Sequence, residues 1–362
     1  MRALRWFSRE LVLASLIACL AGLAACGRTA SPPGATRVPL SGFTAVAFVS
    51  RSSGWLGGPG FILTTVDGGR SWTLGYRGAV RIRVFDALNS RIGWAAGVGG
   101  LLHTADGGAH WTPLSAPGAP LAELDFATAD EGWALTAAGS ESLRSALLRT
   151  ADGGRHWTRE RVAWPVQSVC AASAKVVWAA GRDAAYRTVD GGRVWRRVFA
   201  SPGRGMEAVI RCAGPRVAWL LVNGPGALLQ EPYALYRTAD AGARWSAVAA
   251  NTPMAPWAHA AMGPGSEVGA LDVVSAQSVF LVGFREAPGS GGYWLGKSTD
   301  GGRTWSNVAV PGLSLYDDNR KQPLSVSFVN GRDGWLATSQ RGRGILLVTR
   351  DGGVRWQVQP LH

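Results

Sequence analysis

The sequence has few of the residues on which metal and redox chemistry depend. Only 4 cysteines and 5 histidines occur among 362 residues, and neither type forms a pair with metal-ligand spacing. No glycine-rich loop leads from a predicted strand into a predicted helix, which excludes a phosphate-binding loop of that kind. We therefore expect no metal ion and no cofactor.

Lysine is also scarce, and the total charge is low. Three lysines, Lys175, Lys297 and Lys321, leave 34 arginines among the 37 basic residues. Charged residues make up 17%, below the roughly 25% that is typical of globular domains. The 47% hydrophobic content excludes a disordered chain, and 49 glycines indicate many turns. The net charge of +13 fits either an anionic partner or a genome rich in arginine codons.

No apolar run is long enough for a transmembrane helix. The longest, Leu11–Leu23, has 13 residues, whereas a spanning helix needs about 20. The run follows three arginines and ends in Leu23-Ala24-Ala25-Cys26, which resembles the lipobox of bacterial lipoproteins. The resemblance implies that residues 1–25 are a signal peptide and that Cys26 is lipidated.

Residues 26–41 are rich in Pro, Gly, Ser and Thr and are interpreted as the lipidated Cys26 with a flexible tether. The expected location is the outer membrane or periplasm in a cell with two membranes. In a cell with one membrane it is the outer face of the cytoplasmic membrane. Because export separates the chain from nucleic acid, we expect no nucleic-acid partner.

One short motif occurs seven times, with an aspartate followed by glycines and a tryptophan five residues later. The aspartates are Asp67, Asp106, Asp152, Asp190, Asp240, Asp300 and Asp351. The tryptophans are Trp72, Trp111, Trp157, Trp195, Trp245, Trp305 and Trp356. The motif resembles the Asp-box, or BNR repeat. We expect a hairpin turn in which the aspartate accepts backbone N–H bonds, so its role is structural rather than catalytic.

Each motif follows a short alternating segment that leads into a Trp or Phe, such as Val84-Phe85 and then Gly93-Trp94. Each repeat is therefore predicted to hold four antiparallel strands. Seven such repeats predict an all-β fold, a seven-bladed β-propeller of four-stranded antiparallel blades with Asp-box turns. The propeller is predicted to fill residues 42–362.

Two cysteines, Cys170 and Cys212, fall inside the predicted propeller. A disulfide is one alternative in an oxidising compartment. The repeat alignment places both at equivalent positions of adjacent repeats, which are often too far apart to bridge, so two buried thiols are favoured.

The last three intervals between motifs are longer, and their extra residues lie in loops at the end of the blades opposite the Asp-box turns. Elaborated loops on a rigid scaffold usually carry function, and Arg, Trp and Tyr are enriched in protein-binding sites. The candidate binding residues are Tyr233, Trp257, Arg285, Tyr293, Trp294, Tyr316, Arg320, Lys321, Arg341 and Arg343. We expect a protein partner there, although incidental aromatics in solvated loops remain an alternative.

Five repeats carry a basic residue just before the motif: His103, Arg149, Arg187, Arg237 and Lys297. These residues form either a positive band or ion pairs with acidic groups on the next blade.

Across nearly the whole mature chain, the arrangement resembles the photosystem II assembly and stability factor family. The likeness rests on the seven motifs, the lipoprotein signal and the arginine-rich composition. It implies a non-enzymatic, membrane-anchored scaffold for a membrane or envelope complex. In cyanobacteria and plastids that family acts through the newly made D1 subunit.

The alternative is a carbohydrate-acting propeller, because sialidases and xyloglucan hydrolases also carry Asp-boxes. Arg37-Val38-Pro39 is similar to the Arg-Ile-Pro motif of sialidases, and Tyr233 or Tyr316 would then be the nucleophile. A glycan ligand is therefore possible. The acidic candidates for a hydrolase are Glu231, Glu286, Asp317 and Asp318.

Overall fold

The computed structural model describes residues 42–115, 117–137, 145–202, 207–224, 232–251, 259–285, 292–313, 316–317, 320–321 and 324–361. They belong to one unit of the chain, Pro39–His362. The predicted signal peptide, the tether and Cys26 lie outside the described residues and stay predictions.

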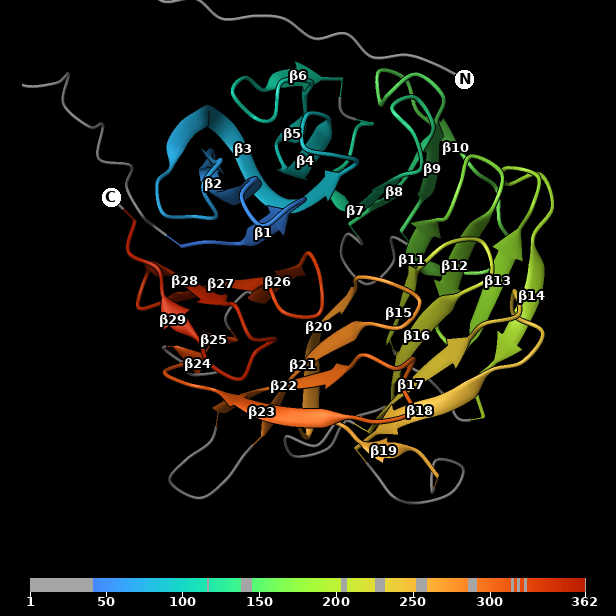
Figure 1. Cartoon of the computed structure of the whole chain (residues 1–362). Coiled ribbons are helices and arrows are strands. Elements are labelled where there is room, and N and C mark those ends of the chain that lie inside the picture. Colours follow the sequence, from blue (N-terminus) through green and yellow to red (C-terminus); the bar gives the residue numbers. More distant parts are fainter. Residues whose placement is uncertain are drawn as a thin grey trace, which may run out of the picture. The chain divides into compact units, whose positions relative to one another are not determined.

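The described residues form an all-β propeller with no helix (Figure 1). The first sheet holds β1 (Ala45–Phe48), β2 (Gly54–Thr65), β3 (Thr73–Ala87), β4 (Gly93–Val98), β5 (Gly100–Thr104) and β6 (Thr112–Leu114). The second holds β7 (Leu121–Phe126), β8 (Gly132–Thr136), β9 (Leu147–Thr150) and β10 (Thr158–Arg159). The third holds β11 (Val166–Ala171), β12 (Val177–Gly181), β13 (Ala184–Thr188) and β14 (Arg196–Ala200).

The second half of the chain forms three further sheets and a small ribbon. The fourth sheet holds β15 (Glu207–Cys212), β16 (Ala218–Asn223), β17 (Tyr233–Thr238), β18 (Ser246–Ala250) and β19 (Ala261–Met262). The fifth holds β20 (Glu267–Val273), β21 (Val279–Arg285), β22 (Gly292–Ser298) and β23 (Ser306–Val310). The ribbon pairs β24 (Tyr316–Asp317) with β25 (Arg320–Lys321), and the sixth sheet holds β26 (Leu324–Phe328), β27 (Gly334–Gln340), β28 (Arg343–Thr349) and β29 (Gln357–Val358).

The prediction of seven four-stranded blades was wrong, because the described residues form six blades. The first two predicted repeats form a single six-stranded sheet. Its strand β3 has 15 residues and pairs with β2 through its first half and with β4 through its second half. Turn signals locate hairpins in a sequence, but they do not reveal that one strand continues from one repeat into the next.

The sheets follow one another in chain order around a common centre, with the last beside the first (Figure 1). The backbone N–H groups of Val46 and Phe48 on β1 donate to the hydroxyls of Ser325 and Ser327 on β26, over 3.0 and 2.9 Å. The ring of Phe48 stacks on Trp335 of β27 at 3.6 Å between centroids. These two hydrogen bonds close the ring between residues that are 279 positions apart in the sequence.

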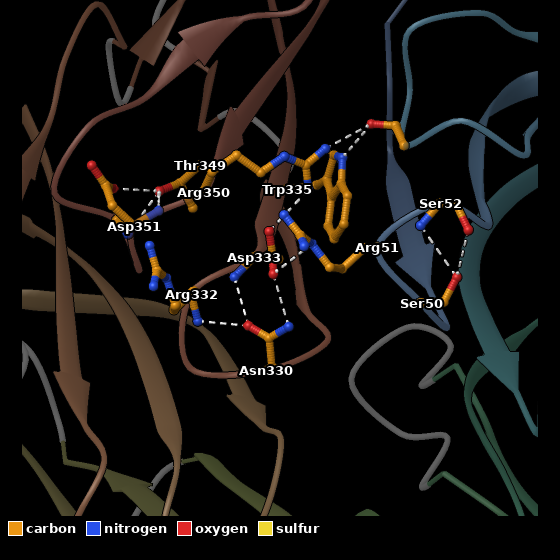
Figure 2. Close-up of polar contacts among 12 residues, drawn as sticks. Ser50, Arg51, Ser52, Asn330, Arg332, Asp333, Trp335, Thr349, Arg350 and Asp351 are labelled. Carbon is orange, nitrogen blue, oxygen red and sulfur yellow. Dashed lines mark hydrogen bonds and ion pairs between the residues drawn. The ribbon is translucent and has the colours of Figure 1, made fainter.

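A buried carboxylate reinforces the closure (Figure 2). Asp333 is 4% exposed, and its carboxylate lies 3.1 Å from Nε of Arg51 in the turn between β1 and β2. The Nη1 atom of Arg350 lies 3.5 Å from the same carboxylate, and Asn330 donates to it from its side-chain amide. Asp333 therefore joins both sides of the junction through charge-assisted contacts.

The hydrophobic core lies between neighbouring sheets. The second strand of most repeats contributes a fully buried tryptophan, namely Trp55, Trp94, Trp133, Trp178, Trp219 and Trp335. The indole N–H of Trp55 donates to the carbonyl of Gly107, and that of Trp335 donates to Gly68 across the closure. In these two repeats one tryptophan thus fills the core and also holds the motif turn of the next repeat. No helix among the described residues is long and apolar enough to cross a bilayer.

Candidate functional site

The seven motif turns share one set of hydrogen bonds. In the first, the Thr65 hydroxyl donates to Asp67 Oδ1 over 2.9 Å and accepts from Gly69 N–H. The N–H of Ser71 also donates to Asp67 Oδ1 over 2.9 Å. The same three bonds recur in the other six turns. The aspartates therefore close turns through their carboxylates.

These bonds also set the charge state of the motif aspartates. Hydrogen bonds from the backbone and side chain of His110 lower the pKa of Asp106 to about 2. Burial alone would raise the pKa of Asp67, but the bonds from Ser71 and Thr65 outweigh it and lower the pKa to about 2. A carboxylate that accepts several N–H and O–H bonds is held in its charged form, so these aspartates remain acceptors at neutral pH.

The glycines supply backbone geometry that other residues adopt with strain. Gly68 and Gly69 have φ of 82° and 93°, and the fifth turn holds Ala241 at φ 66°. The tryptophan that follows seals the turn, since Trp72 donates from Nε1 to the Gly69 carbonyl over 3.0 Å. We call the end of the sheets that carries these turns the turn end, and the opposite end the loop end.

The predicted column of basic residues lies at the turn end and packs on aromatic rings. Arg187 lies opposite Trp178 in the sheet register, with its guanidinium carbon 5.0 Å from the indole centroid. Its Nη2 donates to the carbonyl of Pro215 in the next sheet over 3.0 Å. Burial lowers the pKa of Arg187. Arg187 and Arg237 thus contact main-chain carbonyls of the next sheet, whereas Arg149 pairs with Glu131 of its own sheet over 2.9 Å.

Polar groups on the first strands of the repeats connect neighbouring sheets in a regular way that our sequence reasoning missed. Asp86 on β3 accepts from the N–H of Phe126 on β7, and Asp272 on β20 accepts from that of Phe328 on β26 over 2.6 Å. Ser327 accepts from Phe48 in the same manner across the closure. We call this set the inner-strand ladder.

The ladder follows one rule. Its acceptors lie opposite the buried aromatic residue of the second strand, as in the pairs Asp86↔Trp94 and Asp272↔Phe280. Each donor is the residue one position beyond the equivalent site in the next sheet. The sequence carried a signal for this set. In several repeats an acidic residue lies at the first-strand position that pairs with the buried aromatic residue, as Asp86 and Asp272 do.

Cys170 and Cys212 form a disulfide, so the prediction of two buried thiols was wrong. Cys170 lies opposite Trp178, but Cys212 lies opposite Ala218, and the residue equivalent to Cys170 is Arg211. The two cysteines thus obey the one-residue offset of the inner-strand ladder. Their Cα atoms are 5.9 Å apart, because first strands of adjacent sheets lie close together near the centre of the ring.

Charged members of the same region influence one another. Burial raises the pKa of Asp86 to about 7 and that of Asp272 to about 6. Burial and the charge of Asp86 also raise the pKa of Asp125. Arg211 donates from Nη1 to Glu123 Oε1 over 2.6 Å, which keeps one cation among these carboxyl groups. Among the described residues, no three His, Cys, Asp or Glu side chains are placed to hold a metal ion.

At the loop end, two of the predicted binding residues are buried. Tyr233 is fully buried, its hydroxyl lies against Gly263, and burial raises its pKa. Tyr293 is 4% exposed and packs edge-on against Phe284. Both residues therefore support the loops rather than present a surface.

Four of the predicted binding residues are exposed or half-buried at the loop end. The Arg285 guanidinium carbon lies 4.4 Å from the Trp294 ring centroid, which makes a half-buried cation–π pair at the end of β21 and β22. Arg341 and Arg343 are exposed at the β27–β28 hairpin of the next sheet. The structure thus brings arginine and tryptophan together at one position of the loop end.

The remaining candidates are not placed as side chains. Trp257 lies outside the described residues, as do Glu231, Glu286 and Asp318 of the hydrolase alternative. For Tyr316, Asp317, Arg320 and Lys321, the structure gives only backbone pairing in the β24–β25 ribbon.

Comparisons with known proteins identify the fold and leave the family open. No family model matches the chain, and no curated protein matches it. A structure of YCF48 bound to a D1 peptide is 18% identical with a TM-score of 0.54, covering 88% of this chain and 97% of that one. YCF48 from Cyanidioschyzon merolae is 18% identical with a TM-score of 0.51, covering 77% and 84%.

The structure of an enzyme is similar to this chain to about the same degree. The GH74 xyloglucanase from Xanthomonas campestris is 16% identical with a TM-score of 0.60 and covers 90% of this chain. This chain covers 55% of the xyloglucanase. At these identities the likeness shows a β-propeller, and it does not decide between binding and catalysis.

Proposed function

We propose that this chain is a non-enzymatic propeller that binds a protein segment and serves as an assembly or stability factor for a membrane or envelope complex. The proposal includes export and lipid anchoring at Cys26. The observation that carries it is the match in extent: the chain covers 97% of a propeller whose structure holds a bound peptide. It covers 55% of the xyloglucanase.

The loop end supplies the chemistry for such binding. Arg285 and Trp294 form a preorganised cation–π pair, and Arg343 is exposed on the neighbouring sheet. Arginine and tryptophan dominate the binding energy of many protein interfaces because they combine large apolar area with directional polar contacts. A scaffold of hydrogen-bonded sheets holds both elements in place before a partner arrives.

The experiment is capture from native membranes by the tagged mature chain. The test variant carries Arg285→Glu and Arg343→Glu, and the control carries Arg155→Glu and Arg193→Glu, two exposed arginines at the turn end. We expect one membrane protein to be retained by the parent and the control and to be lost from the test variant. Equal retention by all three, or turnover of xyloglucan by the purified chain, would overturn the proposal.

A further inference from the structure

A groove of about 840 Å³ opens at the turn end between the fourth and fifth sheets. Its polar lining residues include Arg237, Arg244, Arg303, His259, Asp240 and Asp300. We call it the arginine groove. It lies at the opposite end of the sheets from the residues invoked for the proposed function, so it would be a second, independent surface.

The local fold explains why the groove forms between these two sheets. The fourth sheet has an extra strand, β19, which pairs in parallel with β18 through Ala249↔Ala261. His259–Ala261 therefore form a wall outside β18. The opposite wall is the turn of the fifth sheet, where a Cβ on Gly302 would lie 2.8 Å from the Val248 Cβ. The missing side chain lets that turn sit directly on β18, which leaves a floor of small apolar groups.

Three arginines, Arg237, Arg244 and Arg303, line this groove, and none of them forms a salt bridge within 4.0 Å in the described part of the chain. Arg237 packs on Trp219 at 5.3 Å and donates from Nη2 to the carbonyl of Ala276. Its Nε is buried and has no acceptor in the described part of the chain. Burial and the positive charge of Arg303 both lower the pKa of Arg237. The site therefore holds positive charges close together, and a bound anion would reduce the repulsion between them.

The two aspartates in the groove are already engaged. Asp240 accepts from the Thr238 hydroxyl and from the N–H of Arg244. Asp300 accepts from the Ser298 hydroxyl and from both the N–H and the hydroxyl of Thr304. Asp300 therefore uses both of its oxygens in its turn, whereas Asp240 uses Oδ1 alone. The N–H bond from Arg244 and, to a smaller extent, the charge of Arg244 lower the pKa of Asp240, so one of the three arginines has a carboxylate near it.

From this arrangement we propose that the arginine groove binds an acidic peptide segment, with its carboxylates on Arg237, Arg244 and Arg303. Guanidinium groups match carboxylates in a bidentate geometry. Several cations spread over a groove of this volume fit several carboxylates on one segment better than one small anion. The floor of Ala247 and Val248 accommodates the aliphatic parts of glutamate side chains.

The test measures fluorescence anisotropy of a labelled peptide of alternating glutamate and alanine with the purified mature chain. The groove variant carries Arg244→Glu and Arg303→Glu. The matched control carries Arg155→Glu and Arg193→Glu, which occupy the same motif position as Arg303 in other turns. We expect the groove variant to bind at least about tenfold more weakly and the control to change less than about threefold.

Three outcomes would overturn the proposal. The first is an equal loss in both variants, which would indicate attraction by the whole turn end. The second is that a control peptide of alternating glutamine and alanine binds the parent chain as tightly as the glutamate–alanine peptide does. The third is displacement by inorganic phosphate at a concentration where sodium chloride of the same ionic strength has no effect, which would indicate a small-anion site. This test uses a synthetic peptide and not the membrane partner, so its failure does not affect the proposed function at the loop end. Capture of a membrane protein together with no binding of the peptide would show that the proposed function holds and that the arginine-groove proposal fails.

Discussion

The disulfide between Cys170 and Cys212 allows its contribution to the free energy of unfolding to be predicted. The bond closes a loop over a sequence separation of 42 residues. A cross-link of that span removes about 13 cal/mol/K of entropy from the unfolded chain, or about 4 kcal/mol at 25 °C. Replacing both cysteines by alanine should therefore lower the free energy of unfolding by about 4 kcal/mol, with some addition from the lost packing of Cys170.

The assay is urea unfolding of the mature chain, followed by tryptophan fluorescence. The parent should lose about the same stability when dithiothreitol is added, whereas the double alanine variant should be indifferent to the reductant. A loss below about 1 kcal/mol in the variant, or equal midpoints of the parent with and without reductant, would refute the cross-link argument.

Three further predictions concern the junctions and turns. Asp333→Ala removes the carboxylate that joins the last sheet to the first, and should cost about 1–3 kcal/mol of unfolding free energy in urea melts; no loss would show that the closure does not depend on it. The folded-state pKa of Asp272 is raised to about 6, so the stability that it contributes is present below pH 4 and is lost as the pH rises through 6. Asp272→Asn should then be more stable than the parent at pH 8 by about 1–3 kcal/mol, with the difference vanishing near pH 4, and a pH-independent difference would contradict this. Gly108→Ala places a Cβ 2.4 Å from an indole nitrogen and should cost about 2–4 kcal/mol, while Gly118→Ala, which has a similar positive φ and nothing within 4 Å, should lose distinctly less.

The sequence was informative where a feature is local. The Asp67 turn and its six equivalents could be predicted because aspartate, glycine and tryptophan act within a few residues of one another. The strands between them followed from alternation and from the turn positions. These local signals predict an all-β propeller with motif turns at one end.

Features that depend on how strands meet were missed. The continuity of β3 through two repeats reduced seven predicted blades to six. The offset between adjacent first strands brought Cys170 to Cys212, although a repeat alignment argued against a bond. The same offset produces the inner-strand ladder of Asp86 and Asp272, whose partners lie 40 and 56 residues away in the sequence.

The candidate site was predicted less well than the fold. Tyr233 and Tyr293 are among the predicted binding residues, but the structure buries both, whereas Arg285 and Trp294 do meet. The arginine groove was not foreseen, because it depends on a fifth strand that returns parallel to β18. Such a return leaves no periodic signal in the sequence.

We propose that the chain supports the assembly of a membrane or envelope complex without catalysing a reaction. The most direct measurement compares native gels of membranes from cells with and without the chain, with the captured partner detected by antibody. In cells that lack the chain, we expect the mature complex to become scarce and smaller species that contain the partner to accumulate. The chain with Arg285→Glu and Arg343→Glu should fail to restore the complex. Unchanged abundance of the complex in cells that lack the chain would contradict the claim.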